Sequence, residues 1–80
     1  MNKVQQVSKN GSKNDYNLTA REIEVLQLLA KPYSITEIAN ILSVSRTTVI
    51  FHFNNIVEKL AVNDRTGAVS VAIQNNIITQ

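Results

Sequence analysis

The chain contains no cysteine, only one histidine and no long apolar run. Without cysteine it has neither a disulfide framework nor a thiolate metal site. No apolar stretch approaches the ~20 residues that a membrane-spanning helix needs, and residues 1–17 lack the apolar centre of a signal peptide. The sequence therefore predicts a cytoplasmic protein that makes no contact with a membrane.

Groups that carry catalysis are also scarce. The chain has no glycine-rich phosphate loop, and its single histidine, His52, has no carboxylate at a spacing that would orient it. No second ligand stands at metal-binding spacing from His52 either. We therefore expect no enzymatic activity, no metal site and no cofactor.

Length and charge set further limits. At 80 residues with 44% apolar content, the chain is one domain with enough apolar side chains for a core. The isoelectric point of about 9.2 is typical of nucleic-acid-binding proteins. However, residues 1–17 hold three lysines against one aspartate, whereas residues 18–80 hold five basic and five acidic residues. The basic surplus lies in the tail, which counts against strong nucleic-acid binding by a single copy of the domain.

Residues 1–17 differ from the rest of the chain in composition. They are polar, include the turn-forming run Asn10-Gly11-Ser12, and show no apolar periodicity. Two interpretations remain open, a flexible linker to a further domain or a simple disordered terminus. We therefore place the folded domain at residues 18–80.

Start signals for helices occur twice within that domain. Thr19 with Glu22, and Ser34 with Glu37, each have the spacing of a capping box, in which side chain and backbone satisfy each other's end amides. The first box opens a helix that ends before Pro32, because proline disfavours helical geometry at the preceding residue. The second box opens a helix over residues 35–42.

Two further helices complete an all-α fold without strands. The third covers residues 46–60, with apolar residues spaced at four, three and four positions. The fourth begins at about Arg65, where Gly67 weakens the first turn by about 1 kcal/mol relative to alanine. We expect its end to fray at Asn75 and Asn76. The prediction is a four-helix bundle.

The second and third helices are joined by only Ser43, Val44 and Ser45. Val44 is placed to pin this turn into the core, while the Ser45 side chain caps the third helix. Two short amphipathic helices that meet at so brief a turn cross at a steep angle. This is the arrangement of a helix-turn-helix, whose second helix enters the major groove of DNA.

A known family carries this pattern of residues. The matching residues are Leu18-Thr19-Ala20-Arg21-Glu22-Ile23-Glu24-Val25-Leu26, Glu37-Ile38-Ala39, Leu42, Thr48-Val49, His52, Asn55-Ile56, Lys59-Leu60, Val62, Arg65-Thr66 and Ala68-Val69. Together they resemble the LuxR-type DNA-binding domain over residues 17–78. Within that family, the run Phe51-His52-Phe53-Asn54-Asn55 is most similar to the quorum-sensing regulators, whose amino-terminal half binds an acyl-homoserine lactone.

The resemblance implies a partner and an assembly. It implies the DNA-binding domain of a bacterial transcription regulator acting at the nucleoid on double-stranded DNA with a two-fold symmetric site. It also implies a homodimer on DNA that pairs through the last helix. RNA polymerase is a further candidate partner.

The sequence departs from the family at three places. Ile50 stands where the family usually has lysine, Glu58 stands where it often has a basic residue, and Pro32 replaces the glycine after the first helix. Isoleucine cannot pair with a phosphate or a guanine, but it can pack on a thymine methyl group. Loss of one phosphate contact flattens the salt dependence by about 0.9 in log–log slope. We therefore expect weaker recognition that favours A·T pairs.

Ten residues at the third helix are predicted to contact DNA; Arg46, Thr47 and Thr48 lie in its first turn, and Ile50, Phe51 and Asn54 face away from its apolar stripe. They are Ser45, Arg46, Thr47, Thr48, Ile50, Phe51, His52, Asn54, Asn55 and Lys59. Residues of the first turn are expected near phosphates, and Asn54 can bond to adenine bidentately. The alternatives are that the first-turn residues are simply exposed to solvent and that Asn54 is a surface residue without a DNA contact.

Other assignments keep two interpretations each. Phe51 either contacts the groove or packs against a neighbouring helix, and His52 is either a hydrogen-bonded structural residue or a phosphate contact. Lys59 either holds a phosphate or pairs with a carboxylate. Val71 and Ile78 either form the dimer surface or close the core.

Two rival functions share this fold. A protein-binding or antagonist module with little DNA affinity would also expose Ile50 and Phe51. A response-regulator output domain switched by phosphorylation is the other alternative. Salt separates DNA binding from apolar docking, because only DNA binding weakens steeply as the salt concentration rises.

Overall fold

The computed structural model describes residues 15–79, and over this range it contains four helices and no strand. They are α1 (Ala20–Leu29), α2 (Ile35–Leu42), α3 (Arg46–Leu60) and α4 (Arg65–Gln74). The predicted all-α fold and the predicted helix positions are confirmed. Within the described range, no helix is both long and apolar enough to pass through a membrane.

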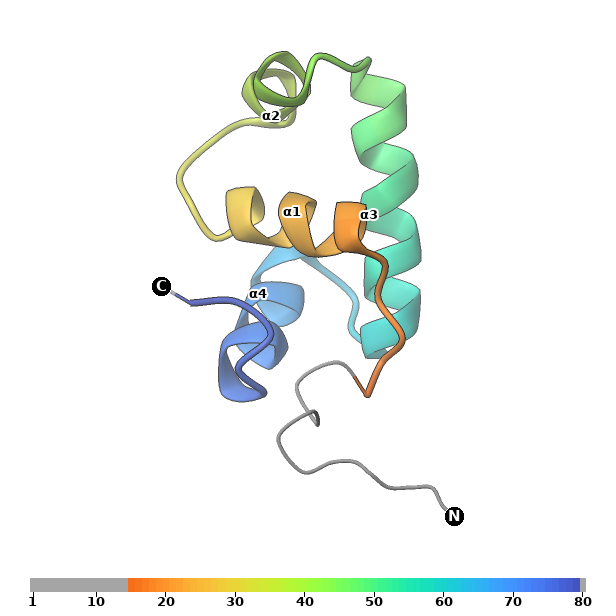
Figure 1. Ribbon diagram of the computed structural model, residues 1–80, viewed down its shortest axis with the longest axis vertical. Helices are drawn as coiled ribbons and strands as arrows, with labels where there is room; N and C mark the ends of the chain where they lie inside the picture. Colours follow the sequence, from red (N-terminus) through yellow and green to blue (C-terminus); the bar gives the residue numbers. More distant parts are fainter. Residues whose placement is uncertain (1–14, 80) are drawn as a thin grey trace.

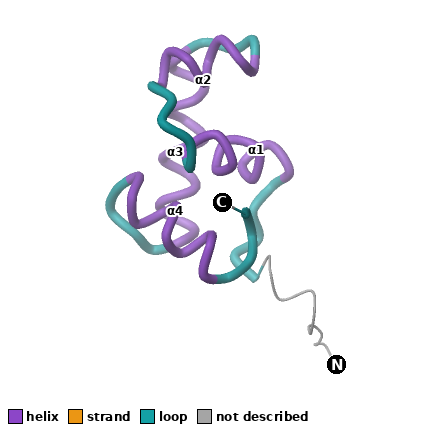
Figure 2. The backbone as a smooth tube through the Cα atoms, turned by 90° about the vertical axis from the view of Figure 1, so that its left-hand side faces the viewer, coloured by secondary structure: helices purple, strands orange, loops and turns teal. Residues whose placement is uncertain are grey.

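The long helix α3 organises the other three. It packs against α1, α2 and α4, whereas α2 and α4 do not contact each other. Figures 1 and 2 both show α2 and α4 at opposite ends of the domain, with α1 between them. The turn that joins α2 to α3 therefore lies at the end of the domain remote from α4.

One apolar cluster holds the helices together. Its buried members are Leu18, Val25, Leu26, Leu29, Ile38, Ala39, Val49, Ile56, Leu60, Ala68, Ala72 and Ile78. Val44 packs against this cluster from the turn between α2 and α3, as predicted. Every helix contributes to the core, so each helix is stabilised by its neighbours and not by its own short length.

Most of the predicted leader lies outside the described residues, which begin at residue 15. The part of the leader that is described belongs to the domain, because Tyr16 packs against the core. Asn17 adopts the left-handed conformation, with φ of 62°. Tyr16 and Asn17 are thus part of the described fold.

Both predicted capping boxes are present. The Thr19 hydroxyl accepts from the Glu22 backbone N–H at 3.1 Å, and the Glu22 carboxylate accepts from the Thr19 backbone N–H at 2.9 Å. Ser34 and Glu37 exchange the same pair of bonds at 3.1 and 2.7 Å. The two boxes fix where α1 and α2 begin.

Three helices end in the same way, with a left-handed residue followed by an apolar residue. The left-handed residues are Ser43, Ala61 and Asn76, with φ of 59°, 58° and 58°. The next residue in each case donates its N–H five residues back, from Val44 to Ala39 (2.9 Å), from Val62 to Val57 (3.0 Å) and from Ile77 to Ala72 (2.8 Å). This is the Schellman motif, which satisfies the last carbonyls of a helix.

α4 ends at Gln74, directly before the two asparagines at which the sequence predicted its end, and these asparagines form a defined cap. Asn75 donates its side-chain amide to the Val71 carbonyl at 2.8 Å, and Asn76 takes the left-handed position that asparagine tolerates well.

The glycine in the first turn of α4, Gly67, also has a structural reason. A Cβ there would lie 3.1 Å from the Asp64 carboxylate oxygen and 3.2 Å from the Val62 Cβ. The glycine lets α4 start close against the preceding loop.

Candidate nucleic-acid interface

The start of α3 is defined by one serine. The Ser45 hydroxyl oxygen accepts from the Thr48 backbone N–H at 3.1 Å and lies 3.0 Å from the Thr48 hydroxyl. Ser45 therefore caps α3, as predicted. The remaining N–H groups of the first turn point out of the N-terminal end of α3. At this end the helix dipole favours an anion such as a phosphate.

The two faces of α3 are sharply different. Val49, Ile56 and Leu60 are buried in the core. On the opposite face, Ile50 is 41% exposed and Phe51 is 60% exposed, both high values for large apolar side chains. Burial of Phe51 against a neighbouring helix, one of the two predicted alternatives, is therefore wrong.

The predicted contact residues fall into two groups by exposure. Ser45, Arg46, Thr47, Ile50, Phe51 and Asn54 are exposed, and Thr48, His52, Asn55 and Lys59 are half-buried. The six exposed residues form what we call the outer face of α3. A helix that reads DNA must leave such a face free of its own domain, and this helix does.

His52 has a different environment from the one predicted. Its ring meets the Phe51 ring edge-on, with centroids 5.6 Å apart and planes at 64°. Among residues 15–79 the His52 ring makes no hydrogen bond, so the predicted structural hydrogen bond of this side chain is not present. Over the same residues no group of histidine, cysteine or carboxylate side chains could hold a metal ion.

Lys59 is engaged within the domain. Its Nζ donates to the Glu22 carboxylate at 2.7 Å and to the Asn17 carbonyl at 3.2 Å. This is the carboxylate pairing that was one of two predicted alternatives. A phosphate contact from Lys59 would require it to leave Glu22, whose side chain is nearly fully buried.

The environment of Glu22 has two opposing effects on its acidity. Burial raises the pKa of the carboxyl group, but the hydrogen bonds and charge of Lys59, together with the Thr19 N–H and hydroxyl, outweigh burial. The pKa of Glu22 therefore lies below its usual value of 4.5. The carboxylate stays ionised and joins the start of α1 to the last turn of α3.

The charge left for DNA on the outer face of α3 is small. Arg46 is its only cation, because Lys59 is paired and Ile50 stands where a lysine would add a second. The remaining exposed groups are hydroxyls, an amide and apolar side chains. Such a surface can hydrogen-bond to phosphates and bases and pack on thymine methyl groups, with a weak electrostatic contribution.

Comparison with known proteins connects this geometry to a family. The profile of the bacterial regulatory proteins of the luxR family matches residues 16–72. The chain belongs to the luxR family. It is thus a DNA-binding domain of a transcription regulator, and not an enzyme.

Relatives of this luxR-family domain are response regulators. The response regulator protein VraR of Staphylococcus aureus and that of Staphylococcus epidermidis are each 51% identical over 61 residues, which are 76% of this chain and 29% of the relative. The crystal structure of the response regulator ChrA from a heme-sensing two-component system aligns with a TM-score of 0.74 and 37% identity, over 95% of this chain and 33% of ChrA. The chain spans about a third of the length of these relatives.

The two residues predicted to form the dimer surface of this luxR-family domain lie in different places. Val71 is half-buried on α4 and packs against the core. Ile78 lies beyond the end of α4 and is 3% exposed. Ile78 therefore closes the core, which was the alternative prediction, and its burial leaves no side-chain surface for a partner.

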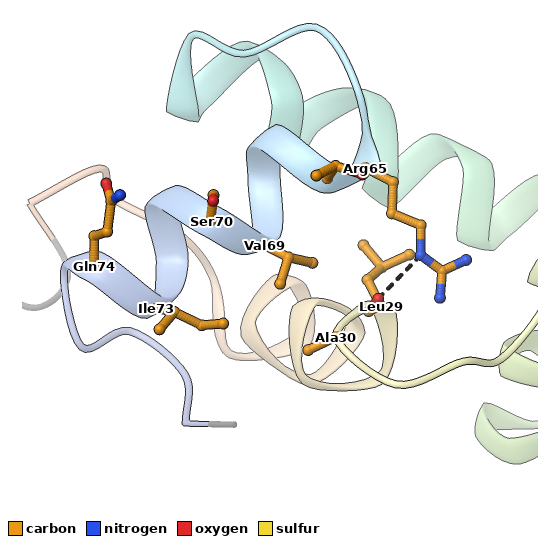
Figure 3. Close-up of a pocket in the computed structure, with 8 residues that line it drawn as sticks. Leu29, Ala30, Arg65, Val69, Ser70, Ile73 and Gln74 are labelled. Carbon is orange, nitrogen blue, oxygen red and sulfur yellow. Dashed lines mark hydrogen bonds between the residues drawn. The ribbon is translucent and has the colours of Figure 1, made fainter.

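A groove lies on the other side of α4. It has a volume of about 510 Å³ and is lined by Leu29, Ala30, Arg65, Thr66, Val69, Ser70, Ile73 and Gln74. Figure 3 shows Val69 and Ile73 of α4 on the side of α1, near Leu29 and Ala30, whereas Ser70 and Gln74 point away from α1. The floor is apolar and the α4 rim is polar and uncharged apart from Arg65. We call this feature the α1–α4 groove.

Sequence reasoning missed the role of Arg65. Its Nε donates to the Leu29 carbonyl at 3.0 Å and its Nη2 donates to the Lys31 carbonyl at 2.8 Å. The C-terminal carbonyls of a helix need partners from outside it, and an arginine is a strong one. No local pattern signals this contact, because the partners are 36 and 34 residues apart in the sequence.

Proposed function

We propose that this domain binds a two-fold symmetric DNA site as a dimer, with α3 in the major groove. The observation that carries the proposal is the outer face of α3. It presents Thr47, Phe51 and Asn54 away from the core on a helix whose start is capped by Ser45. A helix in the major groove contacts base edges with such residues and phosphates with its first turn.

The dimer part of the proposal is supported by α4. Pairing of two copies through α4 would cover the α1–α4 groove, whose rim residues Thr66, Ser70 and Gln74 are uncharged and whose cation, Arg65, is hydrogen-bonded to the end of α1. A single module of this kind buries on the order of 600–1,000 Å² on DNA. Useful affinity then depends on two copies binding together.

The regulator that carries the domain is, in this proposal, a response regulator. The relatives named above are response regulators, and this favours that alternative over the prediction of an acyl-homoserine-lactone regulator. We place its action in the bacterial cytoplasm, at the nucleoid. Contact with RNA polymerase stays an expectation.

The test is a fluorescence anisotropy titration of the chain against a two-fold, A·T-rich duplex at two salt concentrations. Asn54→Ala should weaken binding about tenfold, because a bidentate contact to adenine contributes about 1–3 kcal/mol. Thr47→Ala should weaken it less. Asn40→Ala and Thr36→Ala are matched controls, because both are exposed residues of α2 outside the outer face of α3. If neither Asn54→Ala nor Thr47→Ala differs from its control, the proposed readout is wrong.

The second candidate function is a protein-binding or antagonist module. The exposure of Ile50 and Phe51 favours it, since a continuous apolar surface is also typical of docking sites. The same titration separates the two functions. An affinity that is nearly the same at both salt concentrations would favour the docking module, whereas a steep loss with salt would favour DNA.

A further inference from the structure

Arg65 is the first residue of α4 and reaches across to the end of α1. Its Nε and Nη2 donate to two different carbonyls, those of Leu29 and Lys31, at 3.0 and 2.8 Å. Figure 3 shows the bond to Leu29 at one end of the α1–α4 groove, with Gln74 at the other end. The contact thus fixes α4 at its N-terminal end.

The two hydrogen bonds of Arg65 also constrain the orientation of α4 relative to α1. The guanidinium is planar, and its N–H groups stand at fixed angles, so two bonds to two carbonyls set both the distance and the rotation between helices. The last turn of α1 contains no basic residue of its own. Arg65 therefore supplies the positive charge that the C-terminal end of α1 favours.

The other contacts of α4 are less directional. The fully buried residues of α4 are Ala68 and Ala72. Helix packing angles are set by ridges of side chains that fit into grooves of the neighbour, and alanines form only low ridges. The larger side chains Val69, Val71 and Ile73 also pack against the core but are only partly buried. The two hydrogen bonds of Arg65 therefore add a directional constraint to the orientation of α4.

We infer that Arg65 is a positioning residue, which sets the distance between the two recognition helices in a dimer on DNA. The inference rests on the proposed dimer through α4. α1 packs against both α4 and α3, so a rotation of α4 relative to α1 changes the angle between α4 and α3. In a dimer joined at α4, each copy contains this angle between α4 and α3, so any change in the angle affects the distance between the two α3 helices twice. The angle therefore fixes how far apart two half-sites can lie.

The test is a binding selection from a random-sequence duplex library, carried out in parallel with the wild-type chain and with Arg65→Lys. Lysine keeps the charge but cannot make the two-pronged contact. The matched control is Arg21→Lys, the same substitution at an exposed arginine of α1 paired with Glu24 at 3.5 Å. Circular dichroism at the selection temperature establishes that each variant is folded. Arg65→Gln is a second variant, with a planar but shorter and uncharged donor.

The expected result is a change in spacing without a change in half-site. Wild type and Arg21→Lys should enrich pairs of half-sites at one spacing. Arg65→Lys should enrich the same half-site, with the share at that spacing reduced about fivefold, the ratio that one net hydrogen bond supports. A merely structural role would lower the melting temperature and leave the spacing unchanged, and that result would overturn the inference. If the wild-type chain enriches only single half-sites, the dimer proposal itself fails and the inference fails with it.

Discussion

At the scale of single residues, the pairing of Lys59 with Glu22 is, among the described residues, the ion pair that has a buried partner. Breaking a buried ion pair by removing one partner costs about 3–5 kcal/mol, because the other charge is left buried and unpaired. Lys59 is partly exposed, so we expect Lys59→Met to lower the free energy of unfolding by about 2–3 kcal/mol, measured by urea denaturation. Arg21→Met, which breaks the exposed pair with Glu24, should cost less than about 1 kcal/mol. Equal losses in the two variants would contradict the assigned role.

The lowered pKa of Glu22 has a consequence for acid stability. A carboxyl group whose pKa is lower in the folded state than in the unfolded state stabilises the fold above its unfolded pKa, and this contribution is lost as the pH falls through the folded value. For Glu22 the loss begins below about pH 4.5. We therefore expect the melting temperature of Glu22→Gln to fall less steeply with acidification than that of wild type. Glu24→Gln, at an exposed position of the same helix, is the control for the loss of one negative charge.

Ala61 offers a substitution that should stabilise the domain. It adopts φ of 58° and ψ of 46° at the end of α3, a conformation that costs an L-residue about 1–2 kcal/mol and glycine almost nothing. Ala61→Gly should therefore raise the free energy of unfolding by about 1 kcal/mol in thermal or urea denaturation. Ala30→Gly is the control, because Ala30 ends α1 in the right-handed conformation. That variant should be less stable than wild type by about 0.5–1 kcal/mol. Stabilisation by both would mean that the left-handed geometry is not the cause.

At the scale of helices, local and long-range features differed in how well they could be predicted. The capping boxes at Thr19 and Ser34 could be predicted, because both partners lie within four residues and the chemistry is local. The bond from Arg65 to α1 could not, because dozens of residues separate its ends and any exposed carbonyl is an equally good acceptor in the sequence. Whether Lys59 binds a phosphate or a carboxylate could not be decided from the sequence either, because its partner Glu22 is also distant in the sequence.

The chemistry of α3 gives a prediction about Ile50. Replacing it with lysine restores a cation on the outer face of α3, so Ile50→Lys should bind DNA more tightly and steepen the log–log salt dependence by about 0.9. Ile41→Lys is the matched control, because Ile41 is an equally apolar residue of α2 that is 50% exposed. The measurement is the anisotropy titration at several salt concentrations. Equal slopes for the two lysine variants would show general attraction to DNA and would contradict a specific phosphate contact at position 50.

At the scale of the whole molecule, the two proposed interfaces lie far apart. The turn between α2 and α3 is at one end of the domain and α4 is at the other (Figure 1). α3 runs between them and α1 contacts both α3 and α4, so the core connects the two interfaces mechanically. Because Lys59 is paired internally and the folded part of the chain has no surplus of basic residues, one copy has little electrostatic attraction for DNA. Under the proposal, pairing of two copies adds the affinity that the weak electrostatic attraction of one copy does not supply.

That dependence on pairing can be tested by adding charge to α4. Ser70 is exposed on the rim of the α1–α4 groove, and Ser70→Glu would bring two carboxylates together in a dimer formed there. Juxtaposed like charges at an interface cost several kcal/mol, so the affinity advantage of a paired site over a single half-site should fall at least about tenfold. Affinity for the single half-site should stay at the wild-type value. Thr36→Glu, at an exposed residue of α2, adds the same charge away from α4 and should keep the advantage of the paired site. Sedimentation of each variant with both duplexes gives the stoichiometry, and two copies of Ser70→Glu bound with wild-type affinity would rule out pairing through this face of α4.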